Sequence, residues 1–387
     1  MTSNHIDKIR QYIQTLATSK TSVEQYNEVK ADIEKLTPHE CFLLMDERLE
    51  MNESHETILG YLERLMMVFY PRLKTFEITP IEDSFLDHMH QENIAFIQHL
   101  DHIKEILKKQ DFSTHLETLV SLFETCLVFD AHYLKKENIA FPFLEKKEDV
   151  FKGVSLMWTL HDQTRKTLKE LINSLKGDIT FEEISKLIGR YFFHAYGLVQ
   201  KETYILFPVL SKCSLNELES MREQSFTYGF AFIQTPIYRK SDPIQTSSTS
   251  KWIYTTKTGQ LSYDQLTLFL DMLPLDCTIV NEKDQVVYFN NPKERFFPRS
   301  ESIIGRNVVN CHPSHSVNTV LQILDAFKQN KQDVATFWIN FKGKKLHIQY
   351  LAMRDAQGVY QGVIELTQDV TSIMNLEGEK RLLDWSL

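Results

Sequence analysis

Residues 132–142 read HYLKKENIAFP, and residues 201–208 repeat part of that pattern as KETYILFP. In both runs a Lys-Glu pair stands a few residues before a Phe-Pro pair, at the end of a long stretch with helical apolar spacing. Two alternate helices of a bundle would therefore end in a similar way. The spacing predicts four long helices, at about residues 82–109, 114–147, 152–176 and 181–212.

The first predicted bundle helix carries a single apolar stripe. Its members recur every three or four residues: Phe85, Met89, Phe96, Leu100, Ile103 and Leu107. Upstream, residues 1–75 are predicted to form a small helical domain, in which Thr37 caps a helix, Pro38 is its first residue and Glu40 completes a capping box. We therefore expect two helical units, that domain and a bundle at residues 80–215.

The second half of the chain changes its period. Residues 240–251 (KSDPIQTSSTSK) are polar and rich in Ser and Thr, which is typical of a linker, and we assign residues 216–260 to that linker. Alternating apolar residues then predict strands around 278–280, 286–289, 335–341, 345–353 and 359–369, with a helical stretch at 316–329. The predicted fold class is α plus α+β: an N-terminal helical region, a four-helix bundle, and a five-stranded antiparallel domain at 261–376 before a helical tail at 377–387.

Composition limits the classes of function. The chain has 387 residues, enough for two or three domains, and a formal net charge of −9, which disfavours broad nucleic-acid binding. No apolar run reaches the length of a membrane span, and the first residues, MTSNHIDKIRQYIQ, lack a signal-peptide core. The five cysteines are scattered and never form CxxC, which argues against a disulfide framework and structural zinc. We expect a cytoplasmic protein.

Histidine and glutamate residues of the predicted bundle are candidate metal ligands, because such residues on facing helices are the usual means of holding iron in a bundle. His88 and Glu92 are spaced i, i+4, and helical phase places Glu92 beside the apolar stripe. The candidate set is His88, Glu92, His132, Glu137, His161, His194 and Glu202.

The segments at 132–142, 158–165 (WTLHDQTR) and 201–208 together resemble a hemerythrin (HHE cation-binding) domain. The N-terminal helices and the order of the domains further resemble the DUF438 group of bacterial hemerythrin–PAS proteins. The resemblance implies non-haem iron in the bundle. The residues that match the ligand pattern of the family are His132, His161 and Glu202.

Three positions depart from the hemerythrin pattern. Lys136 stands four residues after His132, where the family has a carboxylate, and Glu137 is displaced from that position by about 100°. Leu198 stands where the family has a histidine, and Asn93 replaces the histidine of the first helix. Two interpretations stay open. One is a mononuclear or weak site on His132, His161, Glu202 and either Glu92 or Glu137; the other is an intact bundle that has lost its site and is kept for domain contacts.

The run from about Asp264 to Leu376 resembles a PAS domain, through the stretches at 273–276, 284–290, 304–306 and 362–371. The resemblance implies a small ligand or cofactor enclosed between the sheet and the helices. Cys311 and His312, in the sequence NCHP, are candidate haem or metal ligands, because a thiolate beside an imidazole is a suitable donor pair. The alternative is a buried cysteine and an exposed histidine in a helix-capping turn.

No stretch matches a histidine-kinase core, a P-loop or a nucleophile elbow, so we do not predict an enzyme. The domain order favours a sensory or regulatory protein that responds to oxygen, nitric oxide, iron or redox state. Its signal would pass to a protein partner, or to a second copy, through the PAS domain and the C-terminal helix. Two alternatives are a non-haem di-iron protein that handles oxygen or nitric oxide or repairs iron centres, and a metal-free interaction scaffold.

Overall fold

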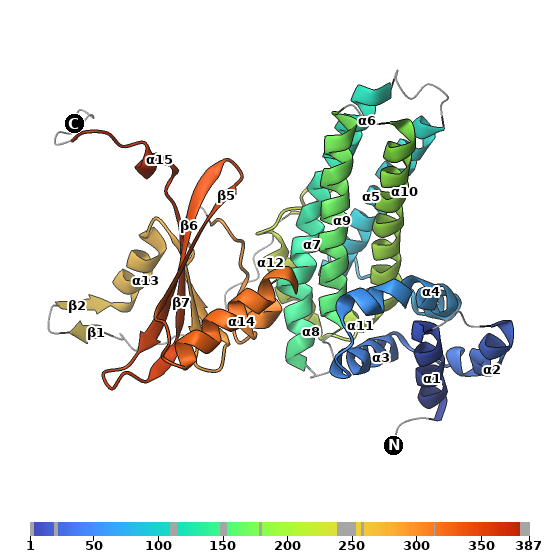
Figure 1. Ribbon diagram of the computed structural model, residues 1–387, viewed down its shortest axis with the longest axis horizontal. Helices are drawn as coiled ribbons and strands as arrows, with labels where there is room; N and C mark the ends of the chain where they lie inside the picture. The colour runs from blue at the N-terminus through green and yellow to red at the C-terminus, as the bar shows by residue number, and fades with distance from the viewer. Residues whose placement is uncertain are drawn as a thin grey trace. The chain divides into compact units, whose positions relative to one another are not determined.

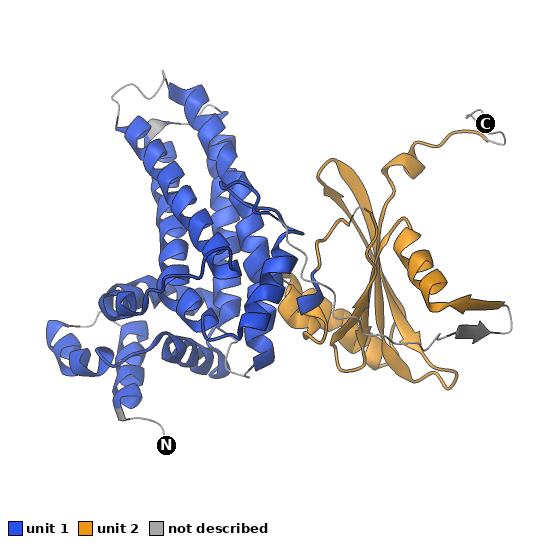
Figure 2. Cartoon of the chain, turned by 180° about the vertical axis from the view of Figure 1, so that it is seen from behind, with its two compact units in different colours: residues 1–241, 300–302 blue, residues 242–299, 303–387 orange. Residues whose placement is uncertain are grey.

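The computed structural model describes residues 4–18, 22–108, 115–147, 153–177, 180–237, 253–256, 259–293, 295–312 and 314–379. The chain divides into two compact units (Figure 2): unit 1 is residues 1–241 with 300–302, and unit 2 is residues 242–299 with 303–387. The Ser/Thr-rich stretch at 240–251 lies outside the described residues.

Unit 1 begins with short helices whose starts are set by side-chain caps. These elements are α1 (Asn4–Thr18), α2 (Val23–Ile33), α3 (Pro38–Glu50), α4 (His55–Leu73) and the 3-10 turn η1 (Lys74–Phe76). The Thr37 hydroxyl accepts a hydrogen bond from the backbone N–H of Glu40, and the Glu40 carboxylate accepts one from the N–H of Thr37. Pro38 is the first helical residue, so the predicted capping box is confirmed.

Four rods follow in unit 1 (Figure 1). The first is α5 (Phe85–Leu107), and the third is α9 (Val154–Leu175). The second joins α6 (Leu116–Thr125), η3 (Cys126–Phe129), α7 (Asp130–Lys135), η4 (Lys136–Ala140) and α8 (Phe141–Lys147). The fourth joins α10 (Phe181–Lys201), η5 (Glu202–Leu206) and α11 (Phe207–Leu210). The predicted stripe on α5 is buried except at its end, where Leu107 is half-buried.

The two similar segments near residues 136–142 and 201–208 each contain a turn of π-helix, η4 and η5. A Phe-Pro pair follows each turn, and a proline cannot donate the N–H that a continuous α-helix needs. A π turn inserts an extra residue ahead of the proline without ending the rod. Lys135, the last residue of α7, and Lys136 and Glu137, the first two of η4, are all buried.

Helix α12 (Leu215–Ser225) and the segment after it belong to unit 1. Met221 and Ala231 are fully buried, and one continuous cluster of buried apolar residues runs from Ile6 to Ala231. The linker assignment is therefore wrong for residues 216–237, because these residues help to cover the bundle. The N-terminal helices share the same core, so they do not form a separate unit.

Unit 2 contains the predicted five-stranded antiparallel sheet (Figure 1). Its strands are β3 (Asp276–Asn281), β4 (Val286–Phe289), β5 (Val334–Phe341), β6 (Lys344–Arg354) and β7 (Tyr360–Asp369), in the spatial order β4-β3-β7-β6-β5. The other elements are β1 (Ile253–Thr256), β2 (Gly259–Ser262), α13 (Tyr263–Met272), η7 (Val308–Cys311), α14 (Ser314–Lys328) and α15 (Thr371–Met374); the 3-10 turn η6 (Glu301–Ile303) is divided between the two units.

The core of unit 2 lies between one face of the sheet and helix α14. Val280 on β3 and Val363 on β7 are paired across the two strands and belong to one buried cluster with Leu324 and Phe327 of α14. Gly362 lies beside this pair with a φ of +134°, and a Cβ there would collide with the carbonyl oxygen of Val280. The close approach of β3 and β7 therefore requires glycine at this position.

The helical tail predicted at the C-terminus is wrong where the structure describes it. Helix α15 ends at Met374, residues 375–379 are not helical, and residues 380–387 lie outside the described residues. None of the residues of α15 is buried. Residues 372–379 are exposed, and packing supplies most of the stability of short helices.

Candidate functional site

Three of the predicted metal-ligand residues meet in the middle of the bundle. Glu92 comes from α5, His132 from α7 and Glu202 from the π turn η5, and all three side chains are fully buried. The Nδ1 atom of His132 lies 2.7 Å from Oε2 of Glu92, and its Nε2 atom lies 2.8 Å from Oε2 of Glu202. The imidazole therefore bridges the two carboxylates.

Two buried lysines complete the contacts of these carboxylates. The Nζ atom of Lys135 donates to Oε1 of Glu92 at 2.6 Å, and the Nζ atom of Lys136 donates to Oε1 of Glu202. The backbone N–H of Ala231 also donates to Glu92, at 2.6 Å. Every oxygen of both carboxylates thus accepts a hydrogen bond from a side chain of the bundle.

The amide of Asn93 adds one more donor to the same group of residues. Its Nδ2 atom lies 2.9 Å from Oε2 of Glu202, on the carboxylate oxygen that His132 also contacts. Asn93 faces the core at the point where the hemerythrin pattern has a histidine. We call Glu92, Asn93, His132, Lys135, Lys136 and Glu202 the central network.

The charges of the central network follow from these contacts. Burial alone would raise the pKa of Glu202, but the charges and hydrogen bonds of Lys136 and His132 outweigh it and hold that pKa well below its usual value. At Glu92, too, burial alone would raise the pKa, but the hydrogen bonds and charges of His132 and Lys135 outweigh it and lower the pKa. Both carboxyls are therefore ionised. Each ring nitrogen of His132 lies at hydrogen-bond distance from one of them, so neither nitrogen is free.

Glu137 and His161 form a second, adjoining group. The Nδ1 atom of His161 lies 2.8 Å from Oε1 of Glu137, and the guanidinium of Arg165 donates to both oxygens of Glu137, at 2.7 and 3.1 Å. Burial, then the charges of Lys136 and Arg165, hold the pKa of His161 well below its usual value. The ring is neutral, and its Nδ1–H donates to Glu137.

Two buried polar atoms of this region have no hydrogen-bond partner within the part of the chain that the structure describes. They are Nε2 of His161 and Oδ1 of Asn93. Because Nδ1 of His161 carries the hydrogen, its Nε2 atom presents a free lone pair. His161 is therefore the predicted ligand next to the central network whose ring nitrogen is both buried and without a partner in the described residues.

The other two predicted ligands have partners away from the central network. His88 on α5 lies 2.9 Å from Asp83 and packs its ring edge-on against Phe230, at 5.4 Å between centroids. His194 on α10 is half-buried, and its Nδ1 atom lies 3.4 Å from the hydroxyl of Thr167. Neither side chain contacts Glu92, His132 or Glu202 by a hydrogen bond that the structure describes.

The bundle residues do not fit the metal ion that a hemerythrin-type fold implies. A metal ligated by carboxylate and imidazole needs open oxygen atoms and a nitrogen lone pair about 2.0–2.2 Å from it. At Glu92 and Glu202 those positions are taken by ammonium, imidazole and amide groups. Among the described residues, no group of three or more His, Cys, Asp or Glu side chains could hold a metal ion.

Cys311 and His312 lie at the end of η7, and both bond to nearby backbone carbonyls. The thiol of Cys311 lies 3.6 Å from the carbonyl oxygen of Asn307, and Nδ1 of His312 donates to the carbonyl of Val308 at 2.8 Å. Burial lowers the pKa of His312, so its ring is neutral. These contacts are typical of a capping turn. They do not support the prediction that Cys311 and His312 form a ligand pair for haem or a metal.

A polar cluster that sequence reasoning missed lies on the inner face of the unit 2 sheet. Glu365 on the central strand β7 is paired with Thr278 on one side and Tyr350 on the other. The Tyr350 hydroxyl donates to Glu365 at 3.3 Å, and Nη2 of Arg299 lies 3.5 Å from the same carboxylate. The Nε atom of Arg299 is buried and has no hydrogen-bond partner in the described residues. We call Arg299, Tyr350 and Glu365 the PAS-face cluster.

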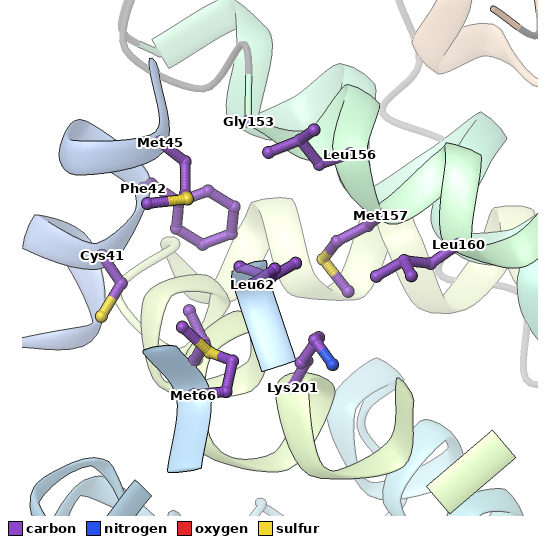
Figure 3. A pocket seen from close by; sticks show the side chains of 11 residues that line it. Cys41, Phe42, Met45, Leu62, Met66, Gly153, Leu156, Met157, Leu160 and Lys201 are labelled. Carbon is purple, nitrogen blue, oxygen red and sulfur yellow. The ribbon is translucent and has the colours of Figure 1, made fainter. Parts of the chain in front are cut away.

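A small apolar cavity lies between the N-terminal helices and the bundle (Figure 3). Its volume is about 50 Å³, which suits one small apolar molecule or stays dry. Figure 3 shows side chains of α3, including Phe42 and Met45, on one side and those of α9, including Leu156 and Met157, on the other. Lys201 is the one charged side chain in the lining, and it pairs with Glu63.

The missed residues differ in whether the sequence could have revealed them. Glu365 lies two residues after Val363 on a predicted strand, so alternation alone places both on the same face. Arg165, which binds Glu137, lies one helical turn after His161. Lys135 gives no such signal, because α-helical phase does not turn it inward together with Lys136.

Two family models match the chain. One describes a hemerythrin HHE cation binding domain and matches residues 84–210; the other describes a PAS domain and matches residues 266–371. No match was found among the curated proteins. The described helices include none that is both long and apolar enough to cross a membrane. The DUF438 resemblance of the N-terminal helices has no matching family model here and stays a prediction.

Three solved structures that are similar to this chain each cover a third of it or less. A C-terminal domain from Streptococcus mutans is 32% identical, covers 33% of this chain and 98% of its own, and has a TM-score of 0.32. A sensory box sensor histidine kinase from Vibrio cholerae is 18% identical over 27% of this chain and 89% of its own (TM-score 0.23). A PAS domain from Colwellia psychrerythraea is 14% identical over 28% and 97% (TM-score 0.23).

The family matches agree with the two kinds of architecture in the structure. The hemerythrin match covers the four rods around the central network, and the PAS match covers the five-stranded sheet with helix α14. This chain combines a hemerythrin HHE cation binding domain, at residues 84–210, with a C-terminal PAS domain, at residues 266–371.

Proposed function

We propose that this chain is a sensory or regulatory protein in which the PAS domain binds a small ligand and the rest of the chain passes the signal to a protein partner. The two domain families support this proposal. Of the expected signals, oxygen, nitric oxide and redox state remain suitable for the PAS domain. Direct sensing of iron by the bundle is not supported, because lysines engage its carboxylates.

The observation that carries the proposal is the incomplete pairing of the PAS-face cluster. Glu365 lies on the central strand of the sheet, on the face that covers the core. Its contact with Arg299 is long, at 3.5 Å, and the buried Nε atom of Arg299 lacks a partner in the described residues. An unsatisfied buried donor is costly, and a bound hydrogen-bond acceptor would remove that cost. We infer a ligand that carries a carboxylate or carbonyl oxygen.

The test is native mass spectrometry of the full-length protein, with an absorption spectrum of the same sample. We expect a non-covalent mass that is present in the wild type and lost in Arg299→Met. The matched control is Lys328→Met, which removes a more exposed cation of the same domain that pairs with Asp284. Equal occupancy in all three proteins, or none in the wild type with no thermal shift on adding small carboxylates, would contradict the proposal. A Soret band would instead identify haem.

A second candidate is the metal-free interaction scaffold, and the central network favours it over a di-iron protein. A di-iron centre that handles oxygen or nitric oxide needs carboxylate oxygens open to metal, and those of Glu92 and Glu202 are engaged. A partner protein or a second copy would face exposed apolar side chains of the PAS domain. On α13 these are Leu268, Phe269 and Met272.

We also propose a cytoplasmic location. All five cysteines are free thiols in the structure, as suits a reducing compartment. We propose no catalytic residue.

A further inference from the structure

We propose that the ammonium groups of Lys135 and Lys136 take the place of metal ions in this hemerythrin domain, so that the bundle carries its own cations. The inference concerns the central network of unit 1 and does not depend on ligand binding by the PAS domain. Its basis is the position, the burial and the charge of the two lysines.

The two ammonium groups occupy the places that a metal would need. Each approaches one oxygen of a buried carboxylate: Lys135 that of Glu92, at 2.6 Å, and Lys136 that of Glu202. A divalent cation binds carboxylate oxygen at about 2.0–2.2 Å, so it could approach only by displacing the ammonium. His132 offers it no lone pair, since both ring nitrogens contact carboxylates.

The negative charges of Glu92 and Glu202 explain why two lysines are tolerated in a fully buried part of the bundle. Two ionised carboxylates without a nearby cation would be strongly destabilising in a site that is fully buried. Lys135 and Lys136 place their ammonium groups at hydrogen-bond distance from the two carboxylates, and His132 contacts both carboxylates. The network is therefore complete without any ion from solution.

The π turn η4 makes this arrangement possible. In a regular α-helix, consecutive residues diverge by about 100°, and three in a row cannot all face the core. Through η4, Lys135, Lys136 and Glu137 are all buried, and each contacts a different partner: Glu92, Glu202 and His161. The backbone irregularity thus delivers both lysines to the carboxylates.

Lys136 is the residue whose removal should open a metal site. Its charge acts directly on His161, so the two groups share one region of the core. Removing the ammonium would leave Oε1 of Glu202 without that donor, while Nε2 of His161 already has no partner among the described residues. A carboxylate oxygen and an imidazole lone pair are good ligands for cobalt(II) and iron(II).

The experiment measures cobalt(II) binding by the full-length chain, through visible absorption and through the melting temperature of unit 1. The wild type should melt at the same temperature in EDTA and in cobalt(II), and should show no bands of a low-coordinate cobalt centre. In EDTA, Lys136→Met should melt about 10 °C lower than the wild type, because it leaves a buried carboxylate without its partner. Cobalt(II) should restore at least half of that loss and produce the visible bands.

A matched control separates the lysine's position from the mere loss of a buried lysine. Lys201→Met makes the same change at a buried lysine of α10 that pairs with Glu63, outside the central network. It should lower the melting temperature without any gain from cobalt(II). Lys136→Gln is a second variant in case Lys136→Met does not fold.

Two results would overturn the proposal. The first is a wild-type chain that binds cobalt(II) with visible bands and melts several degrees higher for it. The second is that cobalt(II) raises the melting temperature of both Lys136 variants no more than that of Lys201→Met. Failure of both variants to refold in the presence of cobalt(II) would count in the same way.

Discussion

The central network of the bundle and the PAS-face cluster are both charged groups inside a core, and they differ in completeness. In the central network every carboxylate oxygen has a donor, at distances no longer than 2.9 Å where Glu92 and Glu202 meet their partners. In the PAS-face cluster the Arg299–Glu365 contact is 3.5 Å, and one buried donor lacks a partner in the described residues. The first is satisfied by the chain itself, and the second still has hydrogen-bonding capacity.

This difference distinguishes polar groups that stabilise the fold from polar groups that can still form hydrogen bonds with a ligand. A fully paired buried network contributes rigidity and needs no ligand, although removing one member is costly. A partly paired cluster can gain stability from a bound molecule, since ligand binding stabilises the state that it fills. In this chain the fully paired network lies in the hemerythrin-type bundle, and the partly paired cluster lies in the PAS domain.

The largest expected effect is at Glu202. Glu202→Gln removes the counter-charge of both His132 and Lys136 in a fully buried place, and should lower the free energy of unfolding of unit 1 by about 3–5 kcal/mol. The measurement is a urea series followed by hydrogen exchange of peptides from each unit. Glu170→Gln is the control, because Glu170 and its partner Arg190 are both partly exposed and the change should cost less than about 1 kcal/mol. A loss below that of the control would contradict a network that holds the bundle together.

The next effect is expected from the backbone of the PAS domain rather than from its polar side chains. Gly362→Ala places a methyl group against the carbonyl oxygen of Val280 and fixes an unfavourable φ, so unit 2 should lose about 2–3 kcal/mol. Gly358→Ala is the control: it also has a positive φ, but open space surrounds its Cβ position. The same urea series gives both values. If the two variants lose equal stability, the close approach of β3 and β7 is not the reason that glycine is needed at position 362.

The third prediction is a pH dependence of the stability of unit 1. The pKa values of Glu92 and Glu202 are lower in the folded state than the ordinary 4.5, so the unfolded chain takes up protons first as the pH falls. Their stabilisation is complete above pH 4.5 and is lost below it, by up to about 1.4 kcal/mol per pH unit for each carboxyl. Urea unfolding at pH 5.5, 4.5 and 3.5 measures it. Glu202→Gln should show a shallower slope, and an unchanged slope would mean that other carboxyls dominate.

The rods, the capping box and the sheet could be predicted because each depends on local spacing. The apolar stripe of α5 follows a period of 3.6, and Thr37, Pro38 and Glu40 act within one turn. The convergence of His132 with Glu202 lay within the predicted ligand set, although the sequence could not say which groups would occupy their atoms. His88 and His194 entered that set on residue type alone, and both have partners elsewhere.

The inward direction of the lysines could not be predicted by helical phase. The π turn η4 changes the direction of Lys135, Lys136 and Glu137 relative to a regular helix, and its local signal is a Phe-Pro pair inside an otherwise continuous pattern. The boundary of unit 1 was missed for a different reason. Residues 226–237 have no regular secondary structure, and their burial depends on packing against distant helices.

The smallest expected effect on stability is at Glu365. This effect tests whether the PAS-face cluster differs from the central network in its contribution to stability. Glu365→Gln keeps the hydrogen bond with Tyr350 and removes an ion pair with Arg299 that is already long, so unit 2 should lose less stability than unit 1 loses in Glu202→Gln. Its effect on ligand occupancy in native mass spectra should be much larger than its effect on unfolding. The matching change in the bundle, Glu202→Gln, should do the opposite: a large loss of stability with no bound species involved. If Glu365→Gln were as destabilising as Glu202→Gln, the PAS-face cluster would be a structural network as well, because only groups that hold the fold together cost that much when one charge is removed.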